Sequence, residues 1–137
     1  MTDVAPWAKY LLDAEQRHEP VALITETEPN LTIEEAYEIQ EALVRQKLAG
    51  GQRIVGAKLG LTSRAKQEAM GVHEPLYAWL TDAMVLPAET PLSLSELIHP
   101  RVEPEIVFVM GEELAGPGVT AYDVLAATSG VGCGLEI

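Results

Sequence analysis

The chain has 137 residues, of which 47% are hydrophobic and 22% charged, a balance typical of a globular domain with a core of its own. Nine basic against 21 acidic residues give a net charge of −12, which leaves no basic surface for nucleic acid. No apolar run approaches a membrane span, and the first residues lack the pattern of a signal peptide. We therefore expect a protein of the cytoplasm that does not act in a membrane. The single cysteine, Cys133, excludes an internal disulfide framework, and we expect it to be a small buried hydrophobic residue.

The first third of the chain carries helical patterns. Apolar residues at helical spacing predict a helix over about residues 3–15. A second helix follows the sequence Thr32-Ile33-Glu34-Glu35, which has the form of a capping box, and Gly50-Gly51 ends it. The predicted apolar stripe of this second helix consists of Ile33, Ala36, Tyr37, Leu43, Val44 and Leu48.

Strand patterns begin at residue 53. We expect a strand loosened by glycines over 53–61, a short strand over 83–86, and a strand over 101–110. Thr62 or Ser63 is expected to cap a short helix ending near Met70, and Thr120 a helix over 121–128. A last strand begins at Val131 and is still running when the chain stops, so we interpret the domain as truncated. This mixture of predicted helices and strands indicates an α+β fold.

Two glutamates on the strand over 101–110 are candidate metal ligands. Glu103 and Glu105 lie two positions apart, so both side chains point to the same face, with Cβ atoms about 6–7 Å apart. Carboxylates at this spacing can converge on a hard cation such as Mg²⁺, which favours oxygen ligands. The alternative is a solvated edge strand, because Pro104 cannot donate a hydrogen bond to a neighbouring strand.

Lys58 is a candidate acid or hydrogen-bond donor, because it is the only charge between Val55 and Leu61. The alternative is that its long stem carries the ammonium group to solvent. Two nucleotide-binding patterns can be discarded. The segment from Gly56 to Ser63 lacks the lysine that a phosphate loop requires, and the glycines over 130–134 follow a helix, which is the wrong order for a dinucleotide site.

Three segments together resemble one family. Val55-Gly-Ala-Lys58-Leu-Gly-Leu-Thr-Ser63, followed by Gln67 and Gly71-Val72, is similar to the G-x-K-[IL]-G-L-T-S stretch of 2-keto-4-pentenoate hydratases and 4-oxalocrotonate (2-oxo-3-hexenedioate) decarboxylases. His99-Pro-Arg-Val-Glu103-Pro-Glu105-Ile-Val-Phe108 resembles their P-R-[IV]-E-x-E-I-x-F strand. Gly134-Leu-Glu136-Ile137 resembles the start of their later L-E-I segment. The matches occur in order along nearly the whole chain, which is identified as the N-terminal half of a member of this fumarylacetoacetase-like superfamily.

The resemblance implies a fold and a set of site residues. It implies N-terminal helices over 1–52, and over 53–137 the first part of a metal-binding catalytic fold with a highly curved mixed β-sheet. It assigns Mg²⁺ or Mn²⁺ to Glu103, Glu105 and Glu136, and places Lys58 in the active site as a catalytic residue. It also implies that Leu76 and Tyr77 bind substrate.

The resemblance leaves the reaction open between decarboxylation and hydration. Hydratases typically carry P-D-F-G after the short helix, whereas this chain has Pro75-Leu76-Tyr77-Ala78-Trp79, closer to the P-x-Y-G-W of the decarboxylases. Leu76 cannot handle a proton, which favours the decarboxylase. Ala78 departs from the usual glycine and puts the local backbone geometry in question.

The resemblance also implies partners. The expected substrate is a small 2-oxo-enedioate from the meta-cleavage breakdown of aromatic compounds, and the expected assembly is a homo-oligomer, with a complex with the pathway hydratase also possible. Two other interpretations stay open. The chain could be a catalytically inactive truncated domain that acts in assembly, because an unfinished sheet has unpaired edges. It could also be a generic acidic binding domain, if the matches were accidental.

Overall fold

The computed structural model describes residues 3–137, which form two compact units. One unit ends at Ile98 and the other runs from His99 to Ile137. The elements are mixed helices and strands, so the predicted α+β class is confirmed. None of the helices in the described range is both long and apolar enough to cross a membrane. The division into a helical region over 1–52 and the first part of a metal-binding catalytic fold over 53–137 stays a prediction.

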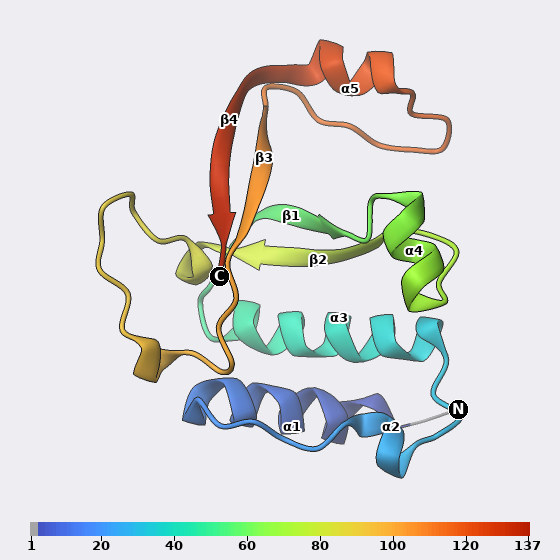
Figure 1. Ribbon diagram of the computed structural model, residues 1–137, viewed down its shortest axis with the longest axis vertical. Coiled ribbons are helices and arrows are strands. Elements are labelled where there is room, and N and C mark those ends of the chain that lie inside the picture. Colours follow the sequence, from blue (N-terminus) through green and yellow to red (C-terminus); the bar gives the residue numbers. More distant parts are fainter. Residues whose placement is uncertain (1–2) are drawn as a thin grey trace. The chain divides into compact units, whose positions relative to one another are not determined.

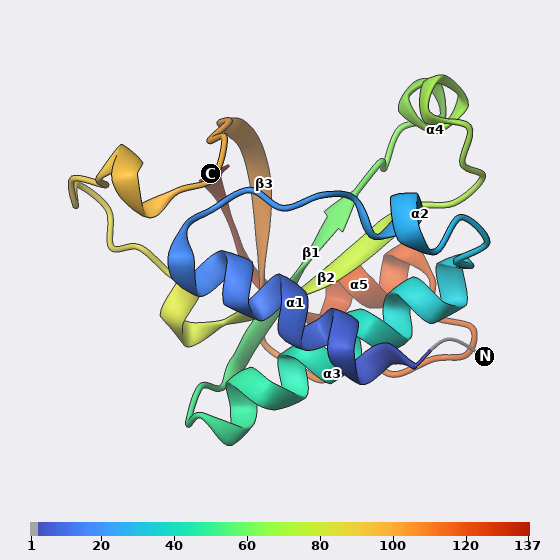
Figure 2. The ribbon, with the colours of Figure 1, turned by 90° about the horizontal axis from the view of Figure 1, so that it is seen from below.

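The first unit is built in layers around helix α3 (Ile33–Ala49). Helix α1 (Val4–Arg17) packs against one side of α3, and the hairpin of β1 (Ile54–Gly60) and β2 (Leu76–Thr81) lies on the other side (Figures 1 and 2). Short helices α2 (Ile24–Thr27) and α4 (Arg64–Met70) and 3₁₀ turns at Asp82–Met84 and Leu94–Glu96 complete the unit. The buried apolar side chains of α1 and α3 are Ala8, Ala14, Ile39 and Val44.

Helix α3 begins at the predicted residue. The Thr32 hydroxyl accepts a hydrogen bond from the Glu35 N–H, and the Glu35 carboxylate accepts one from the Thr32 N–H, so the capping box is confirmed. The predicted apolar stripe is only partly right, because Ile33 and Leu48 are exposed while Ile39 and Lys47 are buried. Since α3 is contacted on two sides, its buried surface is broader than one stripe.

Strands β1 and β2 pair antiparallel, with Lys58 opposite Ala78 and Gly60 opposite Leu76. The strand predicted over 53–61 and the helix capped by Ser63 are both confirmed. Strand β2 was not predicted, and the strand predicted over 83–86 is wrong. At that point the Asp82 carboxylate accepts hydrogen bonds from the N–H groups of Arg53 and Ala83 and holds a 3₁₀ turn.

The second unit is a hairpin with a helix in its connection. Strands β3 (Glu103–Met110) and β4 (Thr128–Glu136) pair antiparallel, and α5 (Ala121–Ala127) begins at a capping box formed by Thr120 and Asp123. The predicted strands and helix of this region are confirmed within a few residues. Cys133 corrects one expectation, since it is exposed. It faces the same way as its register partner Ile106, which is itself 70% exposed.

Asp82 gives a prediction about stability and pH. Its carboxylate also accepts a hydrogen bond from Arg53 Nε, and these bonds from Arg53 lower the pKa of Asp82 below its ordinary value. A lowered pKa in the folded chain means that the stabilisation is present above about pH 4 and is lost as the pH falls through the folded pKa. Asp82→Asn should therefore lower the urea midpoint at pH 7 but much less at pH 3.

A matched control is Asp13→Asn, which removes only an exposed ion pair with Lys9 one helical turn away. Its urea midpoint at pH 7 should stay close to that of the unmodified chain. Equal midpoints for the two variants at pH 7 would contradict the role given to Asp82.

Candidate active site

The hairpin β1–β2 places the predicted site residues of the first unit on two different faces. Because side chains alternate along a strand, Lys58 and Leu76 share one face through their register partners Ala78 and Gly60. Both side chains are half-buried. Tyr77 points to the opposite face, which packs on α3. The structure therefore brings Lys58 and Leu76 to one surface and separates Tyr77 from it.

Tyr77 is held by contacts with α3. Its ring stacks on Tyr37, with centroids 4.7 Å apart, and its backbone N–H donates a 3.2 Å hydrogen bond to the Tyr37 hydroxyl. Next along the strand, the Trp79 indole N–H donates a 2.7 Å hydrogen bond to Glu41. These contacts fix β2 on α3, and they give Tyr77 a packing role in addition to the substrate contact predicted for it.

The turn after β1 holds a residue in an uncommon backbone conformation. Leu61, three residues after Lys58, has φ of 52°, in the left-handed region that branched side chains seldom adopt. The Gln67 side-chain amide donates a 2.8 Å hydrogen bond to the Leu61 carbonyl and restrains this turn. Such strain persists only where neighbouring contacts hold it, and it is frequent at functional sites. The sequence gives no sign of this strain, because nothing distinguishes Leu61 as a residue with positive φ.

The hairpin β3–β4 brings the three predicted carboxylates to one face. Glu103 lies directly opposite Glu136, and Glu105 lies opposite Gly134. Directly opposite residues point to the same side of a hairpin, with Cβ atoms about 4.5–5.5 Å apart. In the described chain, residues 3–137, no three His, Cys, Asp or Glu side chains gather closely enough to hold a metal ion. The backbone register therefore aligns the three glutamates, and rotation of their side chains would be needed to bring the oxygens together.

Gly134 keeps the space beside Glu105 open. A Cβ atom on Gly134 would lie 2.8 Å from Val107 Cγ2, closer than real Cβ contacts allow. Any side chain at this position would also stand opposite Glu105 and on the same face of the hairpin as Glu136, two residues further along β4. The absence of a side chain at residue 134 therefore serves both the packing of the hairpin and the freedom of Glu105 to rotate.

Comparisons with known proteins identify relatives of the chain and a similar solved structure. No family model matches the chain. A 2-hydroxypent-2,4-dienoate hydratase from Pseudomonas putida is 44% identical over 86% of the chain and 54% of its own length. A 4-oxalocrotonate decarboxylase from Pseudomonas sp. strain CF600 is 40% identical over 88% of the chain and 46% of its own length. The solved 4-oxalocrotonate decarboxylase of Pseudomonas putida G7, complexed with magnesium and adipate, superimposes with a TM-score of 0.91 at 38% identity, covering 96% of this chain and 51% of that one.

The chain belongs to the 4-oxalocrotonate decarboxylase and 2-keto-4-pentenoate hydratase family. The resemblance inferred from the three sequence segments is thereby confirmed. The chain spans about half the length of the relatives it matches. What the complete relatives do and bind therefore bears on this chain only as a proposal, argued in the next subsection.

The contact at Gly134 gives a prediction. Gly134→Ala should lower the stability of the β3–β4 hairpin by about 1–3 kcal/mol, because the new methyl group forces Val107 to shift. Gly132→Ala is a matched control in the same strand, since a Cβ there meets nothing within 4 Å. Amide hydrogen exchange of β3 and β4 measures the stability of the hairpin in each of the two variants. Equal exchange rates in the two variants would contradict the close packing at Gly134.

Proposed function

We propose that this chain carries the carboxylate ligands and a catalytic lysine of a divalent-cation-dependent decarboxylase that acts on 2-oxo-3-hexenedioate. One observation carries the proposal. The register of β3 and β4 aligns Glu103, Glu105 and Glu136 on one face, and these are the three residues that the family's sequence pattern assigns to the metal. The similarity to a decarboxylase whose crystals contain magnesium supports the same conclusion.

The three carboxylates fit a hard cation. Mg²⁺ and Mn²⁺ prefer oxygen ligands, and two or three carboxylates with bound waters are a common set for Mg²⁺. Glu103 and Glu136 lie directly opposite each other and carry the same charge, and such a pair destabilises a hairpin. A divalent cation bound by both carboxylates would make the pairing favourable. The cation would act as a Lewis acid that stabilises negative charge on the substrate oxygen.

The residues of the chain then have distinct roles in the reaction. In 2-oxo-3-hexenedioate the departing carboxylate is vinylogous to a β-keto acid, so when its C–C bond breaks the electron pair delocalises onto the 2-oxo oxygen. We assign Lys58 to hydrogen-bond this oxygen and to supply the proton that the dienolate takes up. Glu103, Glu105 and Glu136 hold the cation, and Leu76 and Tyr77 are assigned to substrate contact.

Leu76 favours decarboxylation over hydration. It lies on the same face of β1–β2 as Lys58, so the side chain there is apolar where the hydratase pattern has a carboxylate that can handle water or a proton. The hydratase remains the second candidate, because a relative named as a hydratase is 44% identical to the chain. A catalytically inactive domain that acts in assembly is the third, since the chain spans about half of each relative.

The proposal also covers the complete fold, the oligomeric state, the partner enzyme and the cellular compartment. We infer that in the complete fold the two hairpins are parts of one highly curved sheet, that the protein forms a homo-oligomer, and that it pairs with the hydratase that takes up its product. We also place it in the cytoplasm, where an exposed thiol such as Cys133 stays reduced. These inferences rest on the family's pattern.

Metal binding gives a direct test on the chain itself. Mn²⁺ titration followed by electron paramagnetic resonance should show one site, which Mg²⁺ displaces. Glu105→Gln and Glu136→Gln should each weaken Mn²⁺ binding by about tenfold or more, because each removes a charged ligand. Glu113→Gln removes an exposed carboxylate outside the row and should leave binding unchanged. Equal affinities in the three variants would contradict the proposed ligand set.

Turnover separates the three candidate functions. We expect the chain with Mg²⁺ to consume 2-oxo-3-hexenedioate with release of CO₂, and EDTA to stop the reaction. Lys58→Met should lower kcat strongly while Mn²⁺ binding stays intact. Consumption of 2-hydroxypent-2,4-dienoate without decarboxylation would favour the hydratase instead. Metal binding without turnover of either compound would favour the inactive domain.

A further inference from the structure

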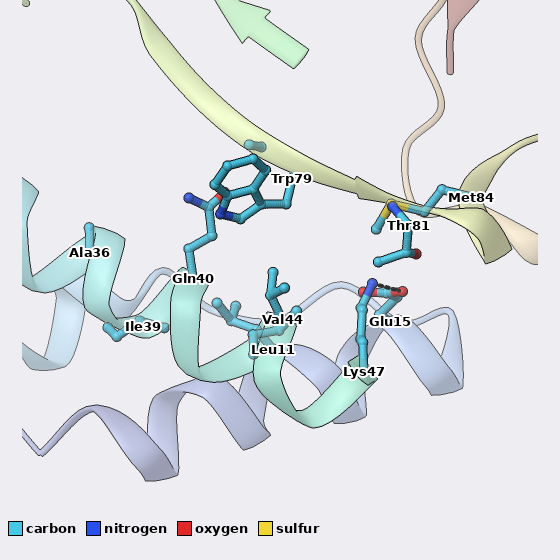
Figure 3. A pocket seen from close by; sticks show the side chains of 12 residues that line it. Leu11, Glu15, Ala36, Ile39, Gln40, Val44, Lys47, Trp79, Thr81 and Met84 are labelled. Atoms are coloured by element: carbon cyan, nitrogen blue, oxygen red, sulfur yellow. Dashed lines mark hydrogen bonds and ion pairs between the residues drawn. The ribbon is translucent and has the colours of Figure 1, made fainter. Parts of the chain in front are cut away.

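The first unit contains a pocket that the proposed reaction does not use. It lies between α3, α1 and β2, with a volume of about 260 Å³ (Figure 3). Most of its wall is apolar. The residues that line it are Leu11, Ala36, Ile39, Leu43, Val44, Ala78, Trp79 and Met84 with the polar Glu15, Gln40, Lys47 and Thr81.

Lys58 is on the other face of the hairpin. Trp79 and Thr81, which border the pocket, alternate along β2 with Ala78, the register partner of Lys58. Since alternate residues of a strand point to opposite faces, Lys58 points away from Trp79 and Thr81, although its register partner Ala78 also borders the pocket. None of the proposed active-site residues lines the pocket, so we treat it as a second site.

One polar group in the pocket wall has no hydrogen-bond partner. The side-chain amide nitrogen of Gln40 is buried, and of the buried side-chain nitrogen and oxygen atoms in residues 3–137 it is the one without a hydrogen bond. The Gln40 side chain extends from α3 toward β2, whose Trp79 also lines the pocket (Figure 3). Buried donors without partners are rare in folded proteins, because each costs about 1–3 kcal/mol.

The other polar groups around the pocket are already paired. The Lys47 side chain is 3% exposed, and its Nζ forms a 2.6 Å ion pair with Glu15 at one end of the pocket (Figure 3). The Trp79 indole N–H donates to Glu41, and the Thr81 hydroxyl donates to Gln52. The pocket thus offers one unused donor in an apolar surrounding. A water molecule needs two to four polar partners, so water is a poor occupant beside Gln40.

We propose that this pocket binds a small, uncharged apolar molecule that carries a single oxygen acceptor, with an aromatic ketone as the best match, because a charged group would be buried without a counter-ion. The acceptor oxygen takes the hydrogen bond from Gln40 Nε2, and the apolar body lies along Val44, Leu43 and the Trp79 ring. An apolar cavity of about 150 Å³ holds benzene, so the larger volume of this pocket accommodates a ring with a short substituent.

Acetophenone is a suitable probe, and the two tryptophans provide the measurement. Trp79 lines the pocket, whereas Trp7 lies on α1 against Tyr10 and does not. In ¹⁵N-labelled chain, acetophenone should shift the Trp79 indole N–H signal in a saturable way and leave the Trp7 signal in place. Benzylamine has a ring of the same size but no acceptor when charged, and it should not bind.

Two variants of α3 test the role of Gln40. Gln40→Leu removes the unused donor at nearly constant size, so the chain should fold at least as stably while acetophenone binding weakens tenfold or more. Gln40→Glu replaces the amide by an isosteric carboxylate that cannot donate a hydrogen bond when ionised, and it should also reject acetophenone. Gln46→Leu changes an exposed glutamine of the same helix and should leave binding unchanged.

Several results would overturn the proposal. The absence of a saturable shift at Trp79 would exclude a binding site in this pocket, and equal shifts at Trp7 and Trp79 would indicate unspecific binding. Equal affinity of Gln40→Leu and Gln46→Leu, or binding of benzylamine as tight as that of acetophenone, would exclude Gln40 as the recognising donor. Because these experiments involve neither metal nor turnover, their outcome is independent of the proposed decarboxylase activity.

Discussion

Side chains alternate between the two faces of a strand, and in an antiparallel pair the residues directly opposite one another point to the same face. Both hairpins of this chain depend on that rule. In β3–β4 it converts the spacing of Glu103 and Glu105 and the pairing of Glu136 with Glu103 into one row of carboxylates. In β1–β2 it turns Lys58 and Leu76 to one face while Tyr77 and Trp79 anchor the other face on α3.

Helix α3 is the element against which the rest of the first unit is ordered. Its start is fixed by the Thr32 and Glu35 capping box, and it is buried between α1 and the β1–β2 hairpin. The polar side chains of α3, and not only its apolar ones, hold the neighbouring elements in place. Glu41 and Tyr37 hold β2 through hydrogen bonds, and Lys47 is buried in an ion pair with Glu15 of α1. Only the lysine of this pair is buried, since the Glu15 side chain is 54% exposed, so it is the charge of Lys47 that would lack compensation without Glu15.

Small residues and strained turns mark the places where chemistry is proposed. Gly134 has no room for a side chain beside Val107, which leaves the space next to Glu105 clear. Leu61 is held at a positive φ by Gln67 just after the strand that carries Lys58. Gly134 also serves the close packing of its own hairpin, whereas the positive φ of Leu61 costs free energy and persists because Gln67 restrains the turn. A binding site needs free space next to its ligands, which Gly134 provides, and a turn with one fixed conformation, which Leu61 and Gln67 provide.

The sequence by itself determined the family, the helices α1 and α3, the strands that carry Lys58 and the first two glutamates, and the candidate ligand set. Capping boxes, alternation and the ordered segments are local patterns, so they are visible without coordinates. Only the tertiary structure decided that β2 is a strand, that Asp82 forms a turn, that Glu136 faces Glu103, and that Tyr77 points away from Lys58. It also revealed the pocket with its unused Gln40 donor, which no pattern predicts because a glutamine on a helix is ordinarily solvated. These features depend on pairing between residues far apart in the chain, and the free energy of such pairing is decided by the partner as much as by the local sequence.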